Sequence, residues 1–145
     1  MKLVFKNKML QSCYFDVELN ISFSHAGISE FWVKEHVGFY KNFTDLHQKT
    51  NNIFYKNSYA FEYHFDERDT SQTGDSILQS PCWIRPESLF RSKIKDLVQV
   101  VGHTKQMKVN FENGIWFTDL YSAGETYLVF ENGKPKIQLC QGSKH

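Results

Sequence analysis

The chain has 145 residues, of which 41% are hydrophobic and 16% aromatic, and 17 Lys and Arg face 16 Asp and Glu. This composition excludes a disordered chain, which would combine few aromatic residues with a large net charge. A net charge of +1 excludes the broad basic surface with which proteins bind nucleic acids or anionic membranes. We expect one domain, residues 1–145, whose function depends on a local site.

The sequence carries no segment typical of membrane insertion or secretion. No run approaches the roughly 20 apolar residues of a membrane span, and lysines interrupt the apolar residues at the N-terminus, unlike in a signal peptide. The three cysteines, Cys13, Cys82 and Cys140, are odd in number and far apart, which favours reduced thiols. We therefore expect a cytoplasmic protein that binds neither membranes nor nucleic acid.

Hydrophobic periodicity predicts the first two elements. Alternating apolar and polar residues over 14–23 predict one half-buried strand, followed by a turn that ends at Gly27. Apolar residues at helical spacing predict a helix over 28–37, with Ser29 as its N-cap.

The middle of the chain shows weaker signals. Thr44 is expected to cap a short helix that ends near His47, with irregular structure after it. The polar segment 66–80 predicts a surface loop. A further helix is expected to begin at Pro86, because proline suits the first helical position.

The last third is predicted to be an antiparallel meander. Asn-Gly at 113–114 and at 132–133 are strong hairpin signals. The expected strands are 98–101, 107–111, 115–120, 125–131 and 137–139. With helices concentrated earlier in the chain, this order indicates the α+β or α/β class.

Two of the six histidines follow predicted strands directly. His25 follows the first strand, and His103 follows the strand over 98–101, after Gly102. Imidazole is the commonest ligand for borderline divalent metals, and ligands often bind at the carboxyl ends of strands. From the residues alone, two interpretations stay open: a pair of metal ligands, or two ordinary histidines at strand ends.

Three segments resemble motifs of one enzyme family. S-H-A-G (24–27), S-P-C-W-I-R-P-E (80–87) and V-G-H-T (101–104) occur in this order along the chain. They resemble segments of the calcineurin-like metallophosphoesterases, in particular the serine/threonine-phosphatase-like branch of bacteria and phages. The resemblance covers residues 14–130.

This resemblance implies a fold, a chemistry and three site residues. The family consists of two-metal hydrolases of phosphate esters with a four-layer α/β/β/α sandwich, of which this chain corresponds to the C-terminal half. His25 and His103 match two ligands of the second metal, which is Mn, Fe or Zn in the intact family. Arg85 matches a basic position near the substrate phosphate, although an ion pair with a structural role is an equal alternative. Asp119 matches an acid that orients a neighbouring loop.

The family's N-terminal motifs are missing from this sequence. D-x-H, G-D-x-x-D-R and G-N-H-E/D would supply the first metal site and the carboxylate that bridges the two ions, and none of them occurs. The resemblance therefore implies a truncated hydrolase that is inactive or incomplete alone, with no catalytic residue assigned and with no ion or one weakly held ion.

Two functions remain open at this stage. The chain is part of a phosphoesterase that a separate N-terminal half or a longer polypeptide completes, acting on a phosphate ester. The alternative is a catalytically dead interaction module, which binds a partner or a second copy through the apolar face that the missing half leaves uncovered.

Overall fold

The computed structural model describes residues 10–64, 75–121 and 126–140. The first two described strands, β1 (Cys13–Asp16) and β2 (Ile21–Ser24), pair antiparallel as a hairpin. The prediction of one strand over 14–23 is therefore wrong. Asp16 and Asn20 favour a turn: the Asp16 side chain accepts a hydrogen bond from the Leu19 N–H at 3.2 Å, and Asn20 has a φ of +54°.

The helices of the described ranges are short except for one. They are α2 (Glu30–Trp32), a π-helix (Val33–Val37), α3 (Phe43–Lys56), a 3₁₀-helix (Ser58–Phe61) and α4 (Pro86–Arg91). The predicted N-cap is confirmed, because the Ser29 hydroxyl accepts the Trp32 N–H at 3.0 Å. The predicted helix start at Pro86 is also confirmed. None of these helices is both long and apolar enough to cross a membrane.

Helix α3 is longer than the sequence predicts, and its N-cap lies two residues earlier. Its N-cap is Asn42, whose side chain accepts the Asp45 N–H, so the prediction of Thr44 as the cap is wrong. The helix continues for 14 residues because Leu46 and Thr50, one turn apart, are buried against the rest of the chain. The asparagine-rich sequence of this helix weakens its hydrophobic periodicity, so the buried face was not predicted.

Of the predicted surface loop over 66–80, residues 66–74 lie outside the described residues. Residues 75–80 form no helix or strand, but most of them are buried, so the prediction of a surface position is wrong for them. The Gln79 and Ser80 side chains bond backbone groups of His64 and Phe61, which holds the segment inside.

The strands form a five-stranded mixed sheet in the order β1-β2-β3-β5-β4 and a separate β6–β7 hairpin. The later strands are β3 (Val98–Val101), β4 (Asn110–Glu112), β5 (Ile115–Phe117), β6 (Thr126–Glu131) and β7 (Lys134–Leu139). The predicted antiparallel meander is wrong for β3, which pairs parallel with β2 and with β5. Both Asn-Gly hairpins are confirmed, with positive φ at Asn113, Gly114, Asn132 and Gly133. The class is mixed α+β.

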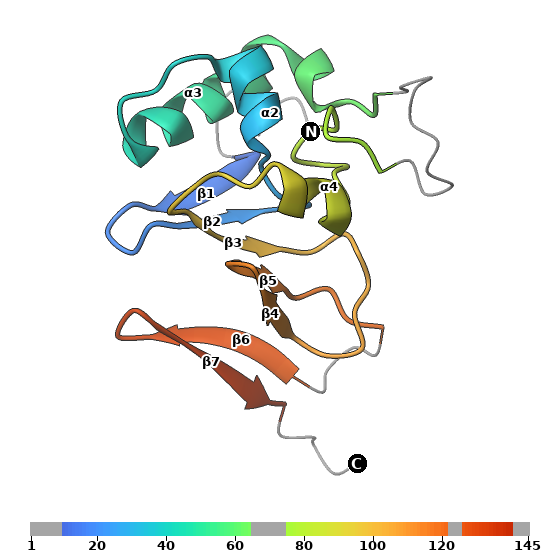
Figure 1. The fold of residues 1–145 in the computed structure, drawn as a ribbon. Coiled ribbons are helices and arrows are strands. Elements are labelled where there is room, and N and C mark those ends of the chain that lie inside the picture. Colours follow the sequence, from blue (N-terminus) through green and yellow to red (C-terminus); the bar gives the residue numbers. More distant parts are fainter. Residues whose placement is uncertain (1–9, 65–74, 122–125, 141–145) are drawn as a thin grey trace.

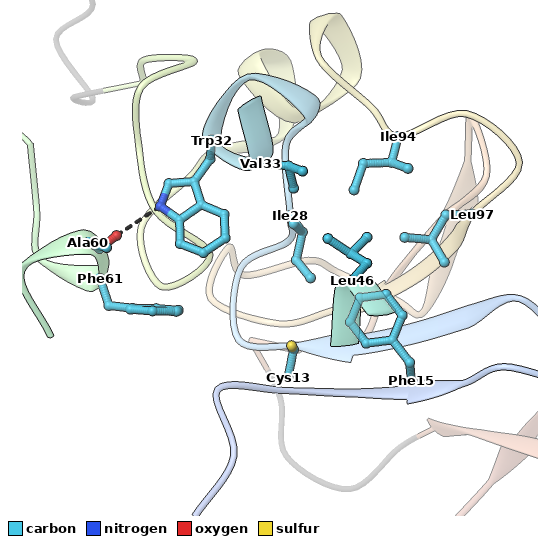
Figure 2. Packing of buried hydrophobic residues seen from close by; sticks show 10 residues of the cluster. All are labelled: Cys13, Phe15, Ile28, Trp32, Val33, Leu46, Ala60, Phe61, Ile94 and Leu97. Atoms are coloured by element: carbon cyan, nitrogen blue, oxygen red, sulfur yellow. Dashed lines mark hydrogen bonds between the residues drawn. The ribbon is translucent and has the colours of Figure 1, made fainter. Parts of the chain in front are cut away.

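Helices α2 and α3 lie on one side of the sheet, and the β6–β7 hairpin lies on the other (Figure 1). The main core fills the space between these helices and the sheet, around Trp32 and Leu46, which are both fully buried (Figure 2). A smaller core lies under α4, where Leu89 and Ile84 pack against side chains of β3 and β5. The parallel strands β2, β3 and β5 thus run side by side at the centre of the molecule.

Candidate metal centre

The two predicted histidines lie at the same edge of the sheet. Ser24 at the end of β2 pairs with Val101 at the end of β3, so the two chains leave the sheet together. His25 follows β2 directly, and His103 follows β3 after one glycine. A hydrogen bond of 2.9 Å from the Gly102 N–H to the His25 carbonyl joins the two loops. Parallel neighbours bring these histidines together because their carboxyl ends share an edge.

The imidazole rings face each other through nitrogen atoms. His25 Nε2 lies 2.9 Å from His103 Nδ1, and the ring centroids are 4.8 Å apart. Two ligand nitrogens that bind one ion at about 2.1 Å in a tetrahedral shell lie about 3.4 Å apart. The two rings would therefore have to separate only slightly from their 2.9 Å contact to hold one ion between them. Without an ion, one ring N–H donates to the lone pair of the other ring.

The backbone at His103 is held in a sparsely populated conformation. Its φ is +64°, and the Thr104 N–H donates to the Gly102 carbonyl at 2.7 Å, which closes a three-residue turn around the histidine. A γ-type turn with positive φ is rare and strained for any residue other than glycine. Such strain is typical of functional sites, where the surrounding structure holds a side chain in one orientation.

The surroundings of His103 favour the neutral form of its ring. Burial lowers its pKa below the usual value for imidazole, the charge of Arg85 and the ring of His25 lower it further, and Asp119 acts in the opposite direction. A neutral ring has a free lone pair at pH values where an ordinary histidine begins to take up a proton. The second ring nitrogen, Nε2, is buried and has no hydrogen-bond partner among the described residues.

Arg85 and Asp119 both lie near His103. The Arg85 Nη1 donates a hydrogen bond to the Thr104 hydroxyl at 3.3 Å, and no ion pair between described residues includes Arg85. Asp119 comes two residues after β5, at the same edge of the sheet as His103. Its carboxylate accepts a hydrogen bond from the Lys105 Nζ at 2.8 Å, which ties it to the loop after His103.

A buried glutamine, which the sequence analysis missed, holds the turn after His25. The Gln99 side chain in β3 is fully buried, accepts the Ile28 N–H at 2.7 Å and donates to the Ile28 carbonyl at 3.0 Å. Gly27 completes the turn with a φ of +119°, and a Cβ there would lie 2.4 Å from Leu89 Cδ2. The sequence feature that could have identified Gln99 is its place as a polar residue inside the apolar run 98–101.

Replacing Gln99 with leucine is expected to lower the free energy of unfolding by about 2–4 kcal/mol, because it leaves a buried N–H and a buried C=O of Ile28 without partners. Urea denaturation followed by circular dichroism measures this change. Gln48→Leu, at an exposed position of α3, serves as the control and should stay within about 0.5 kcal/mol of the parent chain. An equal effect of the two substitutions would contradict the role of Gln99.

Within residues 10–64, 75–121 and 126–140, no group of three or more His, Cys, Asp or Glu side chains is arranged to hold a metal ion. His25 and His103 therefore form a pair of candidate ligands without a third among these residues. A second histidine pair, His36 and His64, has ring centroids 6.1 Å apart. No family model, curated protein or solved structure matches the chain. The proposed function therefore rests on the local geometry of the site.

Proposed function

We propose that the chain is the C-terminal part of a cytoplasmic, metal-dependent phosphoesterase of the four-layer α/β/β/α type. The observation that supports this best is the 2.9 Å approach of His25 Nε2 to His103 Nδ1 at one edge of the parallel strands. In this proposal, the two histidines hold one divalent cation, and the Arg85 guanidinium binds oxygens of the substrate phosphate.

Each of these groups has a distinct task. The two histidine rings offer lone pairs to the cation, Asp119 holds the neighbouring loop through Lys105, and Gln99 keeps the turn after His25 in place. A bound Mn, Fe or Zn ion would polarise the phosphate and activate water. Two protein ligands are too few for a complete site. We therefore propose that the remaining ligands come from an N-terminal half, in the same polypeptide or in a separate one.

Phosphate binding tests this proposal directly. We expect inorganic phosphate to bind the chain only after Mn²⁺ or Zn²⁺ has been added, as measured by isothermal titration calorimetry. Arg85→Gln should lower the phosphate affinity about tenfold, because a charged donor to the phosphate is lost, while the metal affinity stays unchanged. The matched control is Arg91→Gln, at the end of the same helix region, where Arg91 donates to the Ser88 hydroxyl.

The proposal fails if neither ion binds, or if phosphate binds equally well with and without metal. If Arg85→Gln leaves the phosphate affinity unchanged, Arg85 does not bind the phosphate. The role of His25 and His103 as metal ligands is tested separately, by variants of those residues.

A second function is favoured by a row of apolar side chains on the sheet face opposite the helices. One residue from each strand contributes, in direct cross-strand register: Tyr14, Phe23, Val100, Trp116 and Phe111. The hairpin covers this row at Phe23, through an edge contact with Phe130, whereas Tyr14 and Phe111 are about half exposed, at 54% and 50%. We propose that, if the chain acts as a binding module, a second copy covers this face, since a net charge of +1 sets up little repulsion between copies.

Sedimentation equilibrium tests the second function. We expect a dimer for the parent chain and a monomer for Phe111→Asp, because a charge buried in the interface costs more than the contact supplies. Tyr59→Asp, at a residue that is 74% exposed on the helical side, is the control and should remain dimeric. A monomeric parent chain at high concentration would exclude self-association through this face.

A further inference from the structure

A row of aromatic rings runs from the histidine pair to the surface. Trp83 contacts His103 edge-to-face, with centroids 5.7 Å apart and ring planes at 87°. Tyr63 contacts Trp83 in the same way, at 5.7 Å and 83°. Tyr63, Trp83, His103 and His25 come from four different segments of the chain, so the row is a product of the tertiary structure.

The outer two rings are exposed although their backbones are firmly held. Trp83 is 40% and Tyr63 47% exposed. The Trp83 N–H donates to the Ser80 carbonyl at 2.9 Å, and the buried Ser80 hydroxyl donates to the Phe61 carbonyl at 3.0 Å.

Next to Tyr63, the buried Gln79 side chain bonds both the N–H and the carbonyl of His64, at 3.1 and 2.7 Å. Large rings that stay partly in water on a rigid backbone are typical of binding sites, because the core does not need them.

The row also lies beside the proposed phosphate position. Arg85 is two residues beyond Trp83 in the same segment, and its Nη1 donates to the hydroxyl of Thr104, the residue after His103, at 3.3 Å. A ligand whose phosphate is held by Arg85 and the cation would therefore have its organic group near the Trp83 ring. Planar aromatic groups gain most from such a wall, because they stack on it or meet it edge-to-face.

We propose that Trp83 and Tyr63 form a stacking surface that selects phosphate esters carrying a planar aromatic group close to the phosphate. This inference rests on the proposed phosphoesterase function and names the substrate class of that site. Arg85 and the cation held by the histidines bind the phosphate, which every ester shares, and the two aromatic rings discriminate between esters by their organic group.

Binding of two matched esters tests the inference. Phenyl phosphate and cyclohexyl phosphate have rings of equal size, but only the first is planar and aromatic. Titrated into the Mn²⁺-loaded chain, phenyl phosphate should bind about tenfold more tightly, the preference that one stacking contact provides. Trp83→Leu should reduce the preference to nearly one while inorganic phosphate binds as before, and Tyr63→Leu should reduce it by a smaller factor.

The control variant is Tyr127→Leu, which removes a comparably exposed tyrosine from β6 and should keep the full preference. An independent measurement needs only the parent chain, loaded with diamagnetic Zn²⁺ because Mn²⁺ would broaden the signals. The phenyl protons should shift upfield in the proton NMR spectrum on binding, because they enter the ring current of Trp83.

The possible results distinguish a failure of the inference from a failure of the proposed function. Equal affinities for the two esters in the parent chain, or an unchanged preference in Trp83→Leu, would overturn the inference while the proposed function stands. Failure of inorganic phosphate and of both esters to bind the chain in the presence of Mn²⁺ would contradict the proposed function and the inference together.

Discussion

Replacing Trp32 with alanine is expected to lower the free energy of unfolding by about 3–5 kcal/mol, the range for removing a large aromatic side chain from a core. The Trp32 ring is fully buried and packs edge-to-face on Phe61 at 5.1 Å. Its Nε1 donates to the Ala60 carbonyl at 2.8 Å, so the substitution also leaves a buried carbonyl without its donor (Figure 2). Urea denaturation monitored by far-ultraviolet circular dichroism measures the loss.

The matched control is Trp83→Ala. Trp83 is 40% exposed, and its removal should cost less than half as much as the removal of Trp32. Equal losses in the two variants would mean that the segment 58–61 is not held to α2 through the indole, and would contradict the core in Figure 2. This pair of variants also shows whether Trp83 can be changed without loss of the fold.

Replacing His103 with alanine is expected to weaken the binding of Mn²⁺ or Zn²⁺ about a hundredfold. Two ligands on one scaffold bind an ion far more tightly than either does alone, because the second ligand binds at a high effective concentration. With His25 Nε2 only 2.9 Å from His103 Nδ1, the removal of one ring leaves a single imidazole, comparable to any histidine at the surface. Isothermal titration calorimetry of the parent chain and the variant measures the difference.

His47→Gln is the control for the metal experiment. The His47 ring lies on α3 and stacks on Phe15 of β1 with centroids 5.3 Å apart, whereas His25 and His103 contact each other. Its loss should leave the metal affinity unchanged. If His103→Ala binds the ions as well as the parent chain does, the contact between His25 and His103 is a hydrogen bond between two rings and nothing more.

The features that the sequence predicted correctly depend on residues close together in the chain. Ser29 caps a helix through the N–H three residues later, and Pro86 begins one through its own fixed φ. Asn-Gly forms both tight hairpins because these two residues tolerate positive φ. The predicted single strand over 14–23 is wrong for a related reason: alternation continues through a hairpin turn, and Asp16 and Asn20 alone mark the break.

The candidate site shows the same difference between local features, which the sequence predicted, and long-range ones, which it did not. His25 and His103 were identified by the residues around them, but the two are 78 positions apart, and no local rule brings them together. The parallel pairing of β2 with β3 does so, and the meander predicted for the last third of the chain did not include this pairing. Trp83 and Tyr63 were not predicted to join the site, because their ring contacts also connect separate segments.

The sequence by itself determined the composition class, the Ser29 cap, the tight hairpins and the residue types able to bind a cation, because the last three depend on a few neighbouring side chains and backbone groups. The tertiary structure alone decided which strands are neighbours, which edge of the sheet both histidines share, and which aromatic rings stand beside them. Long-range pairing is chosen by the burial of side chains such as Gln99, Leu46 and Trp32 in one common interior, and that choice involves the whole chain at once.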